Sequence, residues 1–152
     1  MAKQDTTEYD LLFQKYQTPS IPWKLLKAQV KAESGFKPNA VSPVGAKGLG
    51  QFMDATWKEW GLKRDVFNPE ANISAQARYM DFLFKFHKKL LPEASEFKLH
   101  WTLAAYNYGL GNTKKLITNG SPHYPTVENC LPKETRDYVA KIMKFYNEYG
   151  VA

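Results

Sequence analysis

The chain has 152 residues, of which 43% are apolar and 14% aromatic, and its 21 Lys and Arg against 15 Asp and Glu give a net charge of +6. This length and composition suit one buried core and leave little room for two, so we expect a single domain over residues 1–152. The positive charge favours contact with polyanions, but the basic residues are scattered and form no stripe of the kind that binds nucleic acid. We therefore predict no nucleic-acid partner.

Several kinds of site are excluded by what the sequence lacks. A single cysteine, Cys130, cannot form an intrachain disulfide, and we expect it to be a partly buried thiol. The three histidines lie at no metal-ligand spacing and no glycine-rich loop follows a strand, so we predict no metal and no cofactor. Residues 1–20 contain no apolar segment typical of a signal peptide, and no apolar run reaches the roughly 20 residues of a membrane span. We expect a monomer made without a signal peptide and without membrane insertion.

Apolar residues at helical spacing predict a first helix over residues 5–16, with Asp5 or Thr6 as its N-cap. A second helix is predicted over residues 22–34, with Pro22 at its first position.

The apolar stripe of this second helix ends on a carboxylate. Trp23, Leu26 and Val30 form the stripe, and Glu33 takes the next position in the last turn. Burial and the negative end of the helix dipole would both disfavour ionisation of a carboxyl there, and a protonated carboxyl suits a general acid. From spacing alone, an ordinary exposed glutamate at the helix end is an equally good interpretation.

Residues 35–50 hold four glycines and two prolines, which excludes a regular element of any length. A loop of this length in a small domain is usually functional. Residues 119–131, with Gly120, Pro122 and Pro125, are expected to form a second loop, and at most a weak hairpin is expected in either loop.

The remaining pattern is helical, and the expected fold is mainly α, with about seven helices and little or no sheet. Asp54 is the expected N-cap of a short helix, and His87 falls on a core stripe as a satisfied, semi-buried residue. The predicted later helices cover residues 54–60, 70–91, 98–108 and 112–118 and a last segment that opens at Pro132.

Six ordered blocks carry a resemblance to a known family. They are Glu33-Ser-Gly-Phe36, Asn39-Ala-Val-Ser-Pro-Val-Gly-Ala46, Gly48-Leu-Gly-Gln51, Asn72-Ile73, Ala104-Ala-Tyr-Asn107 and Pro132-Lys-Glu-Thr-Arg-Asp-Tyr-Val139. Over residues 20–146 the chain resembles the catalytic domain of the soluble lytic transglycosylases, which is related in fold to goose-type lysozyme. The resemblance implies a lysozyme-like domain that cuts the β-1,4 bond between N-acetylmuramic acid and N-acetylglucosamine in peptidoglycan. It also implies 1,6-anhydromuramic product ends.

The same resemblance implies roles for individual residues. Glu33 matches the catalytic glutamate, and five further positions are expected to bind substrate: Ser34, Gln51, Tyr106, Asn107 and Tyr138. Each also has a structural interpretation. Ser34 could bond locally, Gln51 could be an ordinary polar loop residue, the tyrosines could be core residues with satisfied hydroxyls, and Asn107 could cap a helix.

A single glutamate can be sufficient for this reaction. Most glycosidases use two carboxyls about 5 to 9.5 Å apart, and the matched blocks offer no second carboxylate in that role. Glu33 could protonate the leaving oxygen and then take the proton from the substrate's own C6 hydroxyl as it closes on C1.

Two departures from the family pattern keep alternatives open. Gly50 stands where the family often has methionine, and Asp54 stands where proline is common. Asp54 leaves a lysozyme-like muramidase as the first alternative, and a non-catalytic, wall-binding structural module is the second. Gln76 replaces a usually small residue, with no consequence that the sequence explains. A wall enzyme without a signal peptide suggests a phage-encoded protein or one exported by another route.

Overall fold

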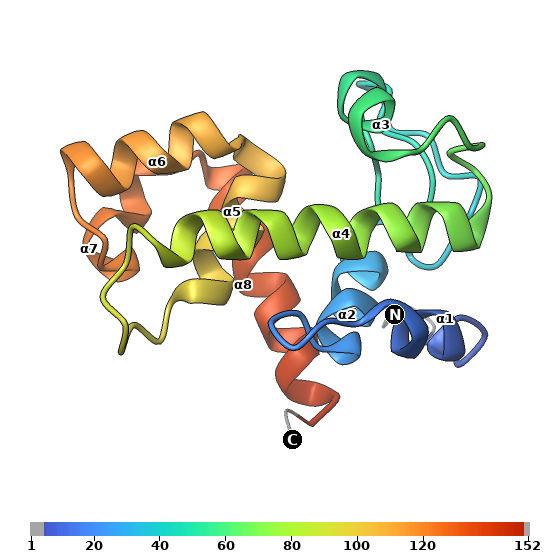
Figure 1. The fold of residues 1–152 in the computed structure, drawn as a ribbon, viewed down its shortest axis with the longest axis horizontal. Coiled ribbons are helices and arrows are strands. Elements are labelled where there is room, and N and C mark those ends of the chain that lie inside the picture. Colours follow the sequence, from blue (N-terminus) through green and yellow to red (C-terminus); the bar gives the residue numbers. More distant parts are fainter. Residues whose placement is uncertain (1–4, 151–152) are drawn as a thin grey trace. The chain divides into compact units, whose positions relative to one another are not determined.

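The computed structural model describes residues 5–150 (Figure 1). Over these residues it has eight α-helices, one 3-10 helix and no strand, only the isolated antiparallel bridges Val41–Lys47 and Lys47–Phe52. The predicted mainly α class is confirmed. The chain divides into a first compact unit, Met1–Tyr79 with Phe145–Ala152, and a second, Met80–Lys144. The single-domain organisation stays a prediction.

The first unit is built from helices at both ends of the chain. It contains α1 (Asp10–Tyr16), α2 (Trp23–Ser34), α3 (Asp54–Trp60), the first half of α4 (Pro69–Lys88) and the end of α8 (Lys133–Glu148). Figure 1 shows α3 on one side of the N-terminal half of α4. Its core is formed by large apolar side chains with no exposed surface, among them Phe13, Ile21, Leu25, Leu26, Leu49 and Ile73.

The second unit holds the second half of α4, then α5 (Lys98–Tyr108), α6 (Leu110–Asn119), α7 (Tyr124–Val127), the 3-10 helix η1 (Glu128–Cys130) and most of α8. Its fully buried side chains include Met80, Leu83, Trp101, Leu103 and Ile142. Of all helices in residues 5–150, none is both long enough and apolar enough to cross a bilayer.

The predicted helix boundaries have their largest errors at three places; smaller errors are that Pro22 is the N-cap of α2 rather than its first residue and that α6 begins at Leu110 rather than at 112. The first helix begins at Asp10 rather than Asp5, because Thr6 Oγ1 accepts the Glu8 backbone N–H (3.1 Å) and the chain turns before the helix. The long helix ends at Lys88 rather than at 91, and the chain then turns through a hydrogen bond from Leu90 N–H to the His87 carbonyl (2.8 Å).

The third correction concerns residues 119–131, which were expected to be a loop. They contain α7 and η1, because Pro125 lies within the first turn of α7, where a missing N–H costs nothing. Tyr124 and Val127 of this helix are buried. Cys130 is exposed, so its predicted partial burial is wrong; the neighbouring Leu131 takes the buried position instead.

Two buried polar side chains in the long helix have partners. Gln76 is fully buried, and its amide nitrogen donates to the Leu26 carbonyl (3.2 Å) and to Gln29 Oε1 (2.7 Å), which ties α4 to α2 within the first unit. Its own Oε1 is buried without a hydrogen-bond partner among the described residues. This explains a glutamine that the sequence left unexplained. His87 is fully buried with both ring nitrogens bonded, to the Leu83 carbonyl and to Thr113 Oγ1 (2.7 Å each), as predicted for a satisfied histidine.

The segment between α2 and α3 is held by hydrogen bonds along its whole length. Lys47 and Phe52 exchange two backbone hydrogen bonds of 2.9 Å, which close the Gly48–Gln51 turn. Ser42 accepts from Ala46 through its side chain (3.0 Å) and also donates its N–H to the Ala46 carbonyl (2.8 Å). The expected weak hairpin is therefore present as paired turns rather than as strands.

Asn72, at the start of α4, fastens this loop to the helix. Its Oδ1 accepts from Gly50 N–H (2.7 Å) and its Nδ2 donates to the Val66 carbonyl (2.8 Å), and the residue has no exposed surface. Gly48 lies against the same amide with φ +80°, and a Cβ there would collide with both Asn72 and the Val66 carbonyl. The loop therefore depends on glycine at 48 and asparagine at 72.

The burial of His87 predicts a pH-dependent stability. Burial lowers the pKa of His87 below its ordinary 6.5, against a smaller opposing effect of its bond to Leu83. The unfolded chain then binds more protons than the folded chain as the pH falls through 6.5, so acidification destabilises the fold, by at most about 1.4 kcal/mol per pH unit for this site. Urea unfolding of the wild type between pH 7.5 and 5 should show this loss, and His87→Gln should show a smaller slope. The slope will not vanish, because burial also lowers the pKa of His100. If stability depended on pH as steeply in His87→Gln as in the wild type, His87 would not be a source of the pH dependence.

Removal of the Asn72 amide should destabilise the fold. Asn72→Ala leaves a buried N–H and a buried carbonyl without their partner, which should cost about 3 kcal/mol in urea unfolding. Asn68 is the matched control: it is exposed and its Oδ1 caps the same helix by accepting from Ala71 N–H (2.9 Å), so Asn68→Ala should cost only about 1 kcal/mol. Equal losses for the two variants would show that Asn72 does no more than an ordinary cap.

Candidate active site

Glu33 lies in the last turn of α2, as predicted, and its residue is half-buried. Leu26 and Val30, one and two turns earlier on the same stripe, have no exposed surface. The stripe therefore runs from the core to the surface, and the carboxylate stands where it emerges. This places a titratable group at an apolar margin that a ligand can reach.

The residues after Glu33 turn the chain sharply. Gly35 caps the helix with φ +61° and donates to the Lys31 carbonyl (3.1 Å), and Phe36 follows with φ +66°. A left-handed conformation is unfavourable for a bulky residue. The Phe36 side chain is nonetheless buried, and this burial offsets the backbone cost. The turn directly after Ser34 is therefore fixed by these two residues.

Ser34 is buried and its hydroxyl donates to the Val30 carbonyl (3.2 Å), the local bond that was the structural alternative for this residue. Gln51 adopts φ +54° and donates its amide N–H groups to the carbonyls of Ala40 (3.3 Å) and Gly48 (3.0 Å). The amide nitrogen of Gln51 thus forms hydrogen bonds within the loop, and its amide oxygen is a hydrogen-bond acceptor. Gln51 is an integral part of the loop rather than an ordinary polar residue on it.

A series of hydrogen bonds joins Glu33's helix end to Gln51. Lys37 N–H donates to the Ser34 carbonyl (3.3 Å), Ala40 N–H donates to the Lys37 carbonyl (3.2 Å), and Ala40 in turn accepts from Gln51. Ser34 and Gln51 therefore belong to one hydrogen-bonded segment of the first unit, and Glu33 directly precedes this segment in the chain.

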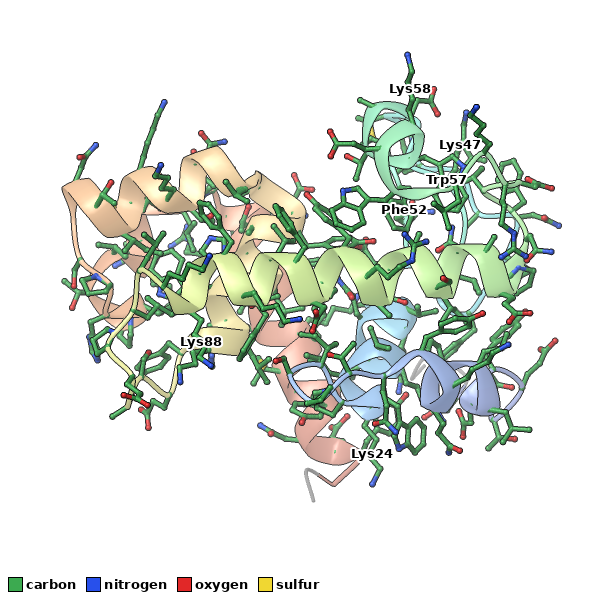
Figure 2. All side chains as sticks on the ribbon, viewed as in Figure 1. Lys24, Lys47, Phe52, Trp57, Lys58 and Lys88 are labelled. Atoms are coloured by element: carbon green, nitrogen blue, oxygen red, sulfur yellow. The ribbon has the colours of Figure 1, made fainter. Side chains whose placement is uncertain are left out.

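Asp54 is the first residue of α3, not its N-cap, which is Met53. Its side chain is 82% exposed and lies 3.0 Å from Lys47 Nζ. Phe52 and Trp57 pack edge to face, with ring centroids 5.2 Å apart; Figure 2 shows both rings, with Lys47 and Lys58 extending outward. The expected capping role is wrong, and the carboxylate instead forms an ion pair at the surface.

The second unit holds the other predicted residues. Tyr106 and Asn107 lie in the last turn of α5 and are half-buried, and Gly109 rather than Asn107 is the C-cap. Thr135 Oγ1 donates to Asn107 Oδ1 (2.7 Å), and Tyr138 follows Thr135 by one turn of α8. Asn107 and Tyr138 are thus linked through Thr135.

Thr135 is a residue that sequence reasoning missed. It is 1% exposed, and by holding the oxygen of Asn107 it orients the amide nitrogen as a donor. The available signal was its position inside the Pro132–Val139 block, three residues before Tyr138. In residues 5–150, no group of three or more His, Cys, Asp or Glu side chains is arranged to hold a metal ion.

Comparison with known proteins finds relatives in sequence and in structure. Residues 10–122 match the sequence profile of the family described as "Transglycosylase SLT domain". Membrane-bound lytic murein transglycosylase F of Haemophilus influenzae (strain PittEE) is 36% identical over 133 residues, which cover 82% of this chain and 26% of that protein. The protein of the same name from Shewanella pealeana is 33% identical over 107 residues, covering 70% of this chain and 22% of the relative.

Solved structures show the same fold. The 70 kDa soluble lytic transglycosylase of Escherichia coli superposes with a TM-score of 0.75 at 27% identity, over 95% of this chain and 24% of that one. A 70 kDa soluble lytic transglycosylase in complex with bulgecin A gives 0.74 at 28% identity, over 94% of this chain and 24% of that one. The chain thus spans about a quarter of the length of these relatives. It belongs to the transglycosylase SLT domain family.

Proposed function

We propose that this chain is a peptidoglycan lytic transglycosylase that cuts the β-1,4 bond after N-acetylmuramic acid, with Glu33 as both acid and base. The observation that carries the proposal is the position of Glu33, half-buried at the end of an apolar stripe and beside a rigid loop, in a chain of this family. The relatives that support it are named as lytic murein transglycosylases.

The proposed reaction needs one carboxyl and no external nucleophile. Protonated Glu33 gives its proton to the glycosidic oxygen as the bond from that oxygen to C1 breaks, and positive charge develops on the ring. The C6 hydroxyl of the same sugar then forms a bond to C1 and returns its proton to the ionised carboxylate. An attacking group already in the substrate has a large entropic advantage over water. The product end is a 1,6-anhydro sugar, and the enzyme is regenerated.

The environment of Asp54 favours this route over a muramidase reaction. A hydrolytic mechanism needs a second carboxylate that activates water or attacks C1. Asp54 is 82% exposed and pairs with Lys47, so neither burial nor a like charge prepares it for that role. The muramidase reaction is therefore the second candidate. A wall-binding module without activity is the third, and an intact Glu33 disfavours it.

We propose that the remaining predicted residues position the glycan. Asn107, with its oxygen held by Thr135, offers its amide hydrogens to a sugar acetyl oxygen. Tyr106 and Tyr138 offer ring faces and hydroxyls, and Gln51 offers its amide oxygen. Ser34 acts by holding the helix end rather than by contacting the sugar. The substrate is cell-wall glycan, and the reaction requires no cofactor.

Replacement of the two carboxylates separately tests the proposal. Glu33→Gln should reduce release of soluble muropeptides from purified peptidoglycan by roughly a thousandfold or more, because it removes both proton transfers. Asp54→Asn should stay within about twofold of the wild type, since an exposed ion pair contributes little. Circular dichroism of both variants checks the fold. If Glu33→Gln retained activity, or if Asp54→Asn were the variant that lost it, Glu33 would not be the acid.

A further inference from the structure

The second unit contains a pocket that none of the proposed catalytic residues lines. It lies where the segment after α4 meets the segment before α7, and it encloses about 230 Å³. It is lined by Pro92, Ala94, Ser95, Glu96, Phe97, Pro122 and His123. Sites for drug-sized ligands usually measure roughly 300–1,000 Å³, so this pocket suits a single ring rather than a chain.

The walls of the pocket are held before any ligand arrives. Trp101 is fully buried and donates its indole N–H to the Pro122 carbonyl (2.9 Å). Lys98 donates to the Glu93 carbonyl (2.7 Å) and Phe97 N–H donates to Ser95 Oγ (3.2 Å), which fix the opposite wall. A pocket that is already ordered loses little freedom on binding.

Phe97 belongs to an aromatic cluster that continues behind the pocket. Its ring packs edge to face on His123 and on His100, at 5.2 Å in each case, and is stacked with Tyr124 at 6.3 Å. Two buried polar atoms of this cluster, His100 Nδ1 and Tyr124 Oη, have no hydrogen-bond partner among the described residues. Unsatisfied buried polar atoms are uncommon in native folds and often mark functional positions.

The polar groups around the pocket suit hydroxyl groups rather than an anion. The exposed Glu96 carboxylate repels anions, and the His123 imidazole is fixed by a 3.0 Å bond between Nδ1 and Thr126 Oγ1. Both side chains can form hydrogen bonds to hydroxyl groups. A pyranose ring has the matching chemistry, with an apolar C–H face for Phe97 and the prolines and a rim of hydroxyls for Glu96 and His123.

We propose that this pocket binds one neutral sugar ring, an N-acetylhexosamine, and so gives the chain a second hold on glycan. The preference for a pyranose follows from the pocket alone, and the choice of an N-acetylhexosamine rests on the proposed function. The pocket holds the glycan and takes no part in bond cleavage.

Amide chemical shifts in the full chain test the pocket. N-acetylglucosamine added to the ¹⁵N-labelled Glu33→Gln variant, which should not cleave glycan, should produce saturable shifts at the amides of residues 95–97, 121 and 123. A second substitution in the same variant, Phe97→Ala, should weaken this binding about tenfold because the ring contact is lost. Phe82→Ala is the matched control, since Phe82 is 45% exposed and does not line the pocket.

A second pair of variants separates binding from folding. Glu96 is exposed, so Glu96→Gln should keep the fold and weaken binding roughly threefold by removing a charge-assisted acceptor. Glu134→Gln, at an exposed position on α8, should leave binding unchanged. The pocket proposal is overturned if these amides show no saturable shifts. It is also overturned if the Phe97→Ala and Glu96→Gln variants bind N-acetylglucosamine as tightly as the parent Glu33→Gln protein. In that case the Glu33-dependent cleavage of peptidoglycan would be unaffected, so failure of the pocket proposal can be distinguished from failure of the proposed function.

Discussion

The first unit depends on one buried carboxamide. Asn72 joins Gly50 and Val66, two points that the chain would otherwise leave apart, and Gly48 packs against it where no side chain fits. Both groups of the amide are used, so no apolar residue and no carboxylate of similar size could replace it without leaving a buried polar group unpaired. The loop that carries Gln51 is therefore a rigid part of the fold rather than a flexible lid.

This rigidity matters because the proposed chemistry has few participants. A single carboxyl that gives and then recovers one proton gains most from exact placement of the sugar, and a loop held at several points provides such placement at low entropic cost. Glu33 itself is placed by a helix whose stripe leaves the core at that residue, with Gly35 and Phe36 fixing the turn behind it. Folding and the proposed catalysis thus depend on the same short segment.

Periodicity was sufficient to predict seven of the helices and the last-turn position of Glu33, because amphipathic stripes are local. It failed where side chains far apart in sequence decide the outcome. The pairing of Asn72 with Gly50, of Gln76 with Gln29 and of Thr135 with Asn107 spans 22 to 47 residues and leaves no local pattern. Proline at 125 was a misleading signal, since the same residue that breaks a helix can also begin one.

The central claim is that the substrate's own hydroxyl, rather than water, closes the reaction at C1. Digestion of purified peptidoglycan in H₂¹⁸O, followed by mass spectrometry of the released muropeptides, tests it most directly. The account predicts new muramic ends without ¹⁸O and about 20 Da lighter than ends hydrolysed in the same water, since no H₂¹⁸O is added in the proposed transfer. Incorporation of ¹⁸O at those ends would show attack by water and would contradict the account.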